Sequence, residues 1–309
     1  MAKKRIGIIG LGDIAQKVYL PLLTVDESVD VVGLMSYTPA TVERLRAKYR
    51  IPFGTTSLDE LLALGLDAVF VHSPTPTHYE IAMRCMARGV AVYVDKPLSY
   101  DWKESVEMAS YAEQKGILLA AGFNRRFAPL YQEAKAWLAQ GGGFDWCSAV
   151  KHRIKQQGHS AKETVYDDLI HMLDLLLWLG EEPYEIKTSH EHVDGEGRLL
   201  HASGSLGFGA GGAIGTYSMV RLAGVDLEKV ELHGSGRSVE VTNLESAVFY
   251  ERGCEPRLRG FGSWSTVLER RGFAGVVKHF IDSLDRPEAC TIRADLVMSS
   301  HQLVERLAE

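Results

Sequence analysis

The chain has 309 residues, of which 46% are hydrophobic and 24% charged, as expected for a globular protein with room for two domains. The net charge of −6 argues against a nucleic-acid-binding surface, and no apolar run approaches the roughly 20 residues that a membrane span requires. The four cysteines are scattered without a CxxC pair, so we expect a cytoplasmic protein without a metal site or a disulfide framework.

The first part of the chain alternates between strand-like and helix-like patterns. Runs that are apolar on both faces, separated by segments of helical period, indicate a parallel sheet covered by helices, the doubly wound α/β class. The predicted strands cover residues 5–9, 29–35, 67–71, 90–94 and 117–121. The predicted helices cover about 13–24, 39–49, 76–88 and 101–115.

A glycine-rich turn follows the first predicted strand. Gly10, Gly12 and Ala15 form a G-x-G-x-x-A pattern, with Asp13 and Ile14 between the second glycine and the alanine. Gly10 permits a tight turn, Gly12 lets the backbone approach a pyrophosphate, and the helix N-terminus attracts negative charge. The pattern predicts a dinucleotide site at Gly10, Gly12, Asp13 and Ile14. The alternative is a glycine turn that binds no ligand.

The second predicted strand ends without the carboxylate that usually binds the ribose of NAD. Two hydroxyl side chains, Ser36 and Thr38, stand there instead and could donate hydrogen bonds to a 2′-phosphate. The sequence therefore favours NADP, and NAD stays open.

Two further strand ends carry polar candidates. Open α/β sheets bind ligands beyond the carboxyl ends of their strands. Ser73, Pro74 and His78 follow one such strand, and Lys96 follows another. We predict that all four contact the cofactor. The alternatives are that His78 only begins a helix and that Lys96 is a solvated surface charge.

A helical segment near the middle of the chain combines ionisable and apolar residues. Asp167, His171 and Asp174 are spaced i, i+4, i+7, so on a regular helix they share one face. The apolar run 169–179 suits a buried helix, and a carboxylate beside an imidazole can orient a general base. The alternative is the wet side of a surface helix.

Basic residues lie on either side of this segment in the sequence. Arg125 is predicted to reach the cofactor or, alternatively, to anchor two domains. Lys151, His152 and Arg153 end a strand-like segment and could line an anionic or polyhydroxyl site. Charges on the strand's wet face are the commoner explanation. The polar residues 155–162 predict a loop over the site.

The period changes to two beyond Pro183. Segments of this period with short turns between them predict antiparallel neighbours in a wide sheet. The predicted strands in this region cover about 184–193, 198–208, 212–221, 227–234, 237–243 and 246–251, and the earlier segment 145–153 is also strand-like. Helices are predicted over 263–284 and 292–307.

Taken together and in order, these motifs resemble the Gfo/Idh/MocA family, the glucose–fructose oxidoreductase and inositol dehydrogenase group of nicotinamide-dependent enzymes. The resemblance rests on the glycine turn, on Asp95-Lys96-Pro97, on residues 122–127 and on the Asp167…His171 helix, and details resemble the bacterial MviM branch. It implies a Rossmann domain over 1–122 and a C-terminal α/β domain over 123–309 with a large, mostly antiparallel open sheet. The outer face of that sheet is expected to form a homodimer or homotetramer.

The resemblance also implies residue roles. The family's Glu-Lys-Pro lysine corresponds to Lys96, with Asp95 in place of the glutamate, and its catalytic histidine and aspartate correspond to His171 and Asp167. Leu169 stands where the family often has glycine. The expected reaction is hydride transfer to or from a sugar or polyol, with His171 as base, Asp167 orienting it and Lys96 holding the reacting oxygen.

Two alternatives to this mechanism stay open. Lys96 could instead belong to a proton relay that includes Tyr166 or the cofactor ribose. The chain could also be a nicotinamide-binding sensor or interaction protein without turnover.

Overall fold

The computed structural model describes residues 2–181, 183–209 and 212–308, which fall into two compact units. The first contains residues 1–123 and 274–298, and the second contains residues 124–273 and 299–309. The second unit differs from the predicted domain 123–309 because 274–298 groups with the first unit. Aromatic packing explains this grouping, because the ring centroid of Phe280 lies 5.3 Å from that of Phe70 and 5.4 Å from that of Tyr93.

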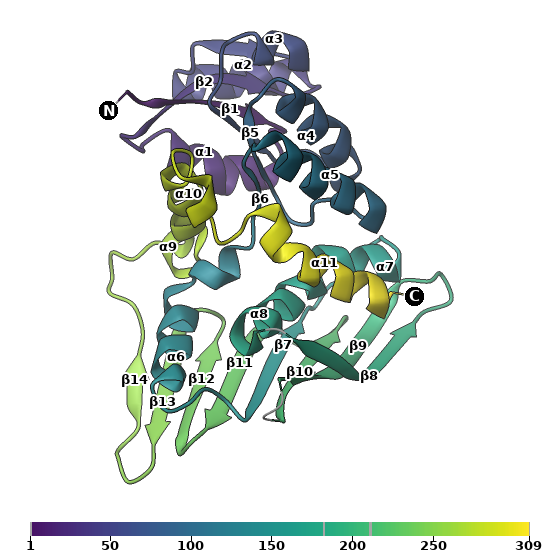
Figure 1. Cartoon of the computed structure of the whole chain (residues 1–309), viewed down its shortest axis with the longest axis vertical. Helices are drawn as coiled ribbons and strands as arrows, with labels where there is room; N and C mark the ends of the chain where they lie inside the picture. The colour runs from purple at the N-terminus through teal and green to yellow at the C-terminus, as the bar shows by residue number, and fades with distance from the viewer. Residues whose placement is uncertain (1, 182, 210–211, 309) are drawn as a thin grey trace. The chain divides into compact units, whose positions relative to one another are not determined.

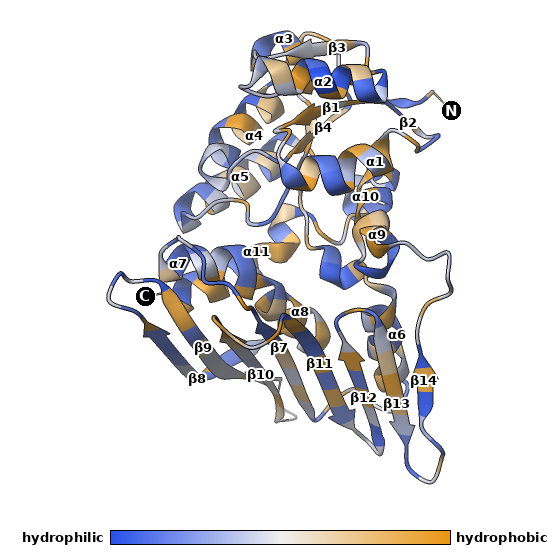
Figure 2. Ribbon diagram, turned by 180° about the vertical axis from the view of Figure 1, so that it is seen from behind, coloured by the Kyte–Doolittle hydropathy of each residue, from blue (hydrophilic) through white to orange (hydrophobic). Residues whose placement is uncertain are grey.

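The first unit is built on a parallel sheet in the order β3-β2-β1-β4-β5-β6. The five predicted strands are confirmed, and the three-residue β3 is additional, too short to show a period of its own. Their hydrophobic character is visible in β1 and β4, which are orange in Figure 2. The bounds are β1 Lys4–Ile9, β2 Val29–Met35, β3 Phe53–Thr55, β4 Ala68–Val71, β5 Ala91–Val94 and β6 Leu119–Ala121.

Helices cover both faces of this sheet, which confirms the doubly wound class. Helices α4 and α5 lie on one side, and α1 and α10 lie on the other (Figures 1 and 2). The bounds are α1 Leu20–Leu23, α2 Pro39–Tyr49, α3 Leu58–Leu62, α4 His78–Ala87, α5 Trp102–Lys115 and α10 Phe273–Asp282, with a π-helical turn Ala15–Tyr19 before α1. Short 3-10 helices cover Thr75–Thr77 and Pro287–Ala289.

The second unit contains an eight-stranded sheet in the order β14-β13-β12-β11-β7-β10-β9-β8. Strands β7 and β10 pair in parallel, and the other neighbours are antiparallel, so the mostly antiparallel sheet is confirmed. The short β14 is additional to the predicted strands. The bounds are β7 Trp146–His152, β8 Tyr184–Val193, β9 Leu199–Phe208, β10 Ala213–Val220, β11 Leu227–Gly234, β12 Arg237–Thr242, β13 Ser246–Glu251 and β14 Arg257–Arg259.

Helices α6 and α8 pack on one face of this sheet (Figure 1). Burial alternates along β7 and β11, and the buried positions include two charged residues, Lys151 and Glu228. The helical elements are α6 Pro129–Ala139, α7 Ala161–Thr164, α8 Ile170–Gly180 and α9 Val267–Arg270, with a 3-10 turn Asn124–Phe127 and a π-helical turn Val165–Leu169. Helix α11, Ala294–Leu307, has residues in each unit.

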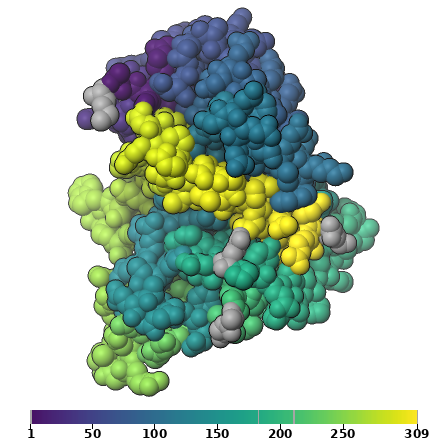
Figure 3. All heavy atoms as spheres, in the orientation of Figure 1, coloured from purple at the N-terminus to yellow at the C-terminus, as the bar shows by residue number. Residues whose placement is uncertain are grey.

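The helix predicted over 263–284 is interrupted. Gly272 separates α9 from α10 with φ +78°, and a side chain there would clash with the backbone of Asn124 and Ala128. The exposed segment before α9, which contains β14, lies on the light green surface in Figure 3. The single predicted helix is therefore wrong, because a positive φ and close backbone packing break it.

Candidate functional site

The glycine turn has the geometry of a dinucleotide cradle. Gly10 has φ +82°, and a Cβ there would collide with the backbone of His72 and Ser73, so only glycine fits. At Gly12 the situation is the opposite, since apart from Gly12 and its two chain neighbours no described residue comes within 4 Å of where a Cβ would stand. Helical residues begin immediately afterwards at Asp13. The open space at Gly12, next to a helix N-terminus, fits a pyrophosphate.

The other residues predicted near this turn are placed as follows. Asp13 is exposed and pairs with Lys17 at 2.6 Å, and Ile14 is half-buried. Ser36 follows β2 and is half-buried, and the exposed Thr38 precedes α2 without capping it through its side chain. Both hydroxyls thus stand at the carboxyl end of β2, and their contact with a ribose stays a prediction.

His78 ties two strand-end loops together. Its imidazole is buried, with Nδ1 3.0 Å from the carbonyl oxygen of Pro97 and Nε2 2.9 Å from that of Ser73. Burial lowers the pKa of His78, although the two carbonyls oppose the shift. Because both ring nitrogens face backbone carbonyls, the structure gives His78 a bracing role. Its predicted contact with the cofactor stays a prediction.

The remaining strand-end residues lie beside this brace. The hydroxyl of Ser73 accepts a hydrogen bond from Thr77 at 2.7 Å, and Pro74 precedes the 3-10 turn that leads into α4. Lys96 is the second residue after β5. It is half-buried and is joined to Pro97 by a cis peptide bond. His78 therefore connects the Ser73–Pro74 loop to the Lys96–Pro97 loop at one end of the sheet.

The proposed base lies in the second unit, just after a π-helical turn. His171 is the second residue of α8 and is buried, with 7% of its surface exposed, whereas Asp167 lies within the π-helical turn and is half-buried. The prediction of a regular helix through this segment is wrong over Val165–Leu169. A π-helical turn has a different residue spacing from an α-helix, so the i, i+4 face argument does not carry across it.

Asp174, farther along α8, is held inside the unit. Its carboxylate accepts hydrogen bonds from Arg126 at 3.0 and 2.6 Å and from the hydroxyl of Ser300 at 2.7 Å. Asp174 is completely buried, and a buried carboxylate needs such partners. This contact attaches α8 to the turn before α6 and to α11.

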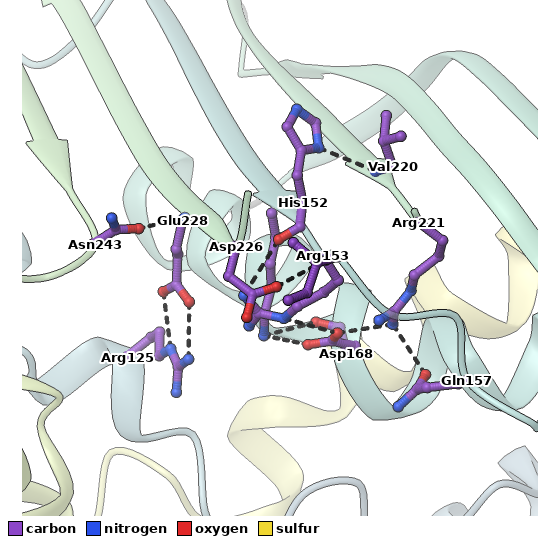
Figure 4. Close-up of polar contacts among 12 residues, drawn as sticks. Arg125, His152, Arg153, Gln157, Asp168, Val220, Arg221, Asp226, Glu228 and Asn243 are labelled. Atoms are coloured by element: carbon purple, nitrogen blue, oxygen red, sulfur yellow. Dashed lines mark hydrogen bonds and ion pairs between the residues drawn. The ribbon is translucent and has the colours of Figure 1, made fainter. Parts of the chain in front are cut away.

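The carboxylate of Asp168 forms ion pairs with three basic side chains at the ends of β7 and β10. Lys151 lies 2.5 Å from its carboxylate, Arg221 lies 2.8 Å away and Arg153 lies 3.4 Å away. Figure 4 shows Asp168 with Arg153 and Arg221, which come from neighbouring strand ends. Burial alone would raise the pKa of Asp168, but the three cations together hold it below its ordinary value. We call these four residues the Asp168 cluster.

A second buried ion pair lies beside the Asp168 cluster. Arg125 donates to both oxygens of Glu228 at 3.0 and 2.9 Å, and Tyr131 donates to the same carboxylate at 3.4 Å. Burial opposes ionisation, yet Arg125 lowers the pKa of Glu228 to about 2. Glu228 also pairs in register with Lys151 across β11 and β7. Arg125 thus has a structural partner, and its predicted contact with the cofactor stays a prediction.

The position of Lys151 contradicts the interpretation that the charges at the end of β7 lie on a wet strand face. Its side chain is only 1% exposed, so it does not belong to a wet strand face. Burial lowers its pKa to about 7, more than Asp168 and Glu228 raise it. Alternation along the strand would have shown that Lys151 shares a face with the apolar Cys147 and Ala149. The same alternation places Glu228 on the face of β11 that carries Val230 and Leu232. No local pattern of this kind marks Asp168 or Arg221.

The described residues offer neither a membrane-spanning helix nor a cluster of metal ligands. Across the described part of the chain, no helix is long and apolar enough to cross a bilayer. Among the same residues, no group of three or more histidine, cysteine or acidic side chains is arranged to hold a metal ion.

Comparison with known proteins assigns the chain to a family. Residues 4–123 match the model for the oxidoreductase family with an NAD-binding Rossmann fold, and residues 129–252 match the YceM-like C-terminal domain. The protein named YceM of Salmonella typhimurium is 35% identical over 99% of this chain and 98% of its own length. The chain belongs to the Gfo/Idh/MocA family of oxidoreductases. Both the family and its MviM-like branch were predicted from the sequence.

Solved structures of relatives agree with this assignment. The dehydrogenase MviM from Clostridium difficile has a TM-score of 0.93 and 32% identity, covering 99% of this chain and 98% of that chain. A Gfo/Idh/MocA oxidoreductase from Vibrio cholerae has a TM-score of 0.81 and 25% identity, covering 99% and 100%. The inositol 2-dehydrogenase of Acidothermus cellulolyticus is 30% identical over 57% of this chain and 53% of its own length. The Gfo/Idh/MocA family is therefore established by both sequence and fold.

Proposed function

We propose that this oxidoreductase transfers a hydride between a nicotinamide cofactor and a secondary alcohol or ketone of a sugar, a polyol or a related small molecule. The observation that carries the proposal is the turn from Gly10 to Gly12, where a glycine at positive φ and an open space precede a helix N-terminus. The inositol 2-dehydrogenase relative supports the alcohol chemistry. When bound, the cofactor supplies the hydride acceptor or donor.

The residues that would hold the cofactor follow from the strand ends of the first unit. Gly10, Gly12 and the backbone at Asp13 and Ile14 would face the pyrophosphate. The strand-end residues Ser36, Thr38, Ser73, Pro74, His78 and Lys96 are proposed for the remainder, with Arg125 as a further candidate. Ser36 and Thr38 support a preference for NADP, because a carboxylate at that position would repel a 2′-phosphate.

The proton chemistry is assigned to the chain's own side chains. His171 removes the hydroxyl proton as the carbon loses its hydride, since an imidazole can accept and return a proton at neutral pH. Asp167 orients the imidazole and stabilises its protonated form. Lys96 holds the reacting oxygen and stabilises the negative charge that develops on it. In the reverse direction His171 returns the proton to the new hydroxyl.

The first experiment is a fluorescence titration of the purified full chain with NADPH and with NADH. Binding of NADPH more tightly than NADH would support the role of Ser36 and Thr38. Binding of neither cofactor by folded protein that carries no retained nucleotide would overturn the proposal. Binding without turnover on a broad panel of sugars and polyols would instead favour a nicotinamide-dependent sensor.

We also infer a homo-oligomer, a dimer or a tetramer, in the cytoplasm. The face of the C-terminal sheet opposite α6 and α8 carries exposed large hydrophobic side chains, Trp146, Val220 and Tyr250, which suits an interface. The four free cysteines suit a reducing compartment. Light scattering of the purified chain tests the oligomer, and a monomer would contradict it.

A further inference from the structure

The Asp168 cluster contains more positive charge than its carboxylate can neutralise. Arginine stays protonated in proteins, so Arg153 and Arg221 are both cations whatever the protonation state of Lys151. All three basic side chains share the single carboxylate of Asp168. The nearby Glu228 is already bound on both oxygens by Arg125. The cluster therefore keeps an excess of positive charge in a largely buried place.

The two arginines are fixed side by side by the backbone. Arg153 and Arg221 form an isolated parallel bridge directly after β7 and β10. The N–H of Arg153 donates to the carbonyl of Val220 at 2.9 Å, and the N–H of Arg221 donates to that of Leu200 at 2.7 Å. Like charges on neighbouring strands repel each other unless an anion lies between them. The pairing is therefore unfavourable by itself, and Asp168 compensates only part of it.

Hydrogen-bond donors in the cluster also remain unused. Arg221 has 3% of its side chain exposed, and its Nε has no hydrogen-bond partner among the described residues. One of its terminal nitrogens donates to Asp168 at 2.8 Å and to Gln157 at 3.0 Å. The guanidinium of Arg153 lies 3.4 Å from the carboxylate of Asp168 and donates a long hydrogen bond, 3.4 Å, to the carbonyl of His152. A guanidinium usually satisfies more of its N–H groups than this when it is buried.

Other acidic side chains nearby remove only part of this excess. Asp226, drawn in Figure 4, is exposed and accepts a hydrogen bond from the backbone N–H of Ile154. Asp167 attracts Arg221 more weakly than Asp168 does. Arg153 is the accessible member of the cluster, with 26% of its side chain exposed. An anion would therefore enter beside Arg153 and the loop that carries Gln157.

We propose that Arg153 and Arg221 form an oxyanion subsite, so that the substrate carries a carboxylate or a phosphate ester in addition to its reacting hydroxyl. The inference rests on the proposed function, because the cluster shares its carboxylate with the π-helical turn that contains Asp167 and precedes His171. Planar guanidinium groups bind both kinds of oxyanion through paired hydrogen bonds. A neutral polyol would leave the positive charges uncompensated.

Calorimetric titration of the full chain at low ionic strength tests the subsite without requiring turnover. The probes are D-glucuronate, D-glucose 6-phosphate, D-glucose and inorganic sulfate. We expect the anionic hexoses to bind at least about tenfold more tightly than glucose, a factor that corresponds to about 1.4 kcal/mol. A preference for glucuronate or for the phosphate ester would identify which oxyanion the site takes. Equal binding of glucose, or no binding of any anion, would overturn the proposal.

Variants connect the effect to the cluster. Arg153→Gln should remove the preference for anions, and the partly exposed side chain and long contacts of Arg153 make a folding defect unexpected. Arg221→Lys keeps the charge but removes the second guanidinium, so it should weaken oxyanion binding less. The control is Arg252→Gln, an exposed arginine of the same unit. Anion binding that survives Arg153→Gln would show adventitious surface binding and overturn the proposal.

The design separates this inference from the proposed function. Anion binding that depends on Arg153 in a chain that binds no nicotinamide would refute the dehydrogenase and leave the oxyanion subsite in place. Turnover of neutral sugars with no effect of Arg153→Gln would support the dehydrogenase and refute the subsite.

Discussion

The substitution Asp168→Asn tests how much the buried charge cluster contributes to stability. Asparagine has nearly the same shape, so the change removes the charge and leaves Lys151, Arg153 and Arg221 without a shared carboxylate. Removing one partner of a buried ion pair costs about 3–5 kcal/mol. Because Arg153 is partly exposed and can turn toward water, we expect a loss at the low end of this range, about 3 kcal/mol in the free energy of unfolding.

The loss should also depend on pH. The pKa of Lys151 is lowered to about 7 by burial, whereas an unfolded lysine titrates near about 10.4. Between these values the unfolded chain binds more protons, so this lysine makes stability increase as pH rises. Without Asp168 its pKa should fall further, and the increase should begin at lower pH. The deficit of Asp168→Asn should therefore be larger at about pH 6 than at about pH 8.

Urea unfolding followed by tryptophan fluorescence is a suitable assay. Four of the five tryptophans, Trp137, Trp146, Trp178 and Trp264, belong to the second unit, so the signal reports mainly on the unit that contains Asp168. The control is Asp226→Asn, because an asparagine oxygen can still accept the hydrogen bond from Ile154. A deficit below about 1 kcal/mol at both pH values would refute the view that the carboxylate balances the buried cations.

Three further predictions concern the cofactor turn, the base and the second ion pair. Gly12→Ala should leave thermal stability unchanged and weaken nicotinamide binding, whereas Gly10→Ala should also lower stability, as a melting curve with and without NADPH would show. His171→Ala should abolish turnover while a fluorescence titration shows unchanged cofactor binding, and residual turnover near wild type would exclude it as the base. Arg125→Met should lower the free energy of unfolding by roughly 3–5 kcal/mol, and the double variant Arg125→Met with Glu228→Leu should lower it by less. Additive losses for the two substitutions in urea unfolding would contradict the pairing.

The strands were the most predictable part of the molecule. A parallel sheet buried on both faces requires continuous apolar runs, and a sheet covered on one face requires alternation, so β1 and β11 both left a readable pattern. The three-residue strands β3 and β14 are too short for either pattern. The helix break at Gly272 has a different cause. It depends on the close approach of a backbone segment distant in the sequence, which no local pattern shows.

The candidate site was predictable where its geometry is local. Gly10 and Gly12 belong to one turn, so their spacing alone indicated the cradle. Asp168 is different, because its partners Lys151 and Arg221 lie 17 and 53 residues away in the sequence. Nothing in the pair Asp167-Asp168 shows which of the two half-buried carboxylates joins the cluster of basic side chains. Only the three-dimensional pairing of β7 with β10 decides it.

The π-helical turn connects these structural contacts to the proposed chemistry. Such turns are rare and often occur at functional sites, since the inserted residue disturbs the regular hydrogen bonding of the helix. Here Lys151 binds both the carboxylate and, at 3.3 Å, the backbone carbonyl of Asp168, so one buried side chain holds the turn through two of its groups. Asp167 occupies the same turn, and His171 follows it at the start of α8. Disruption of the Asp168 cluster should therefore disturb the proposed base through the position of the turn.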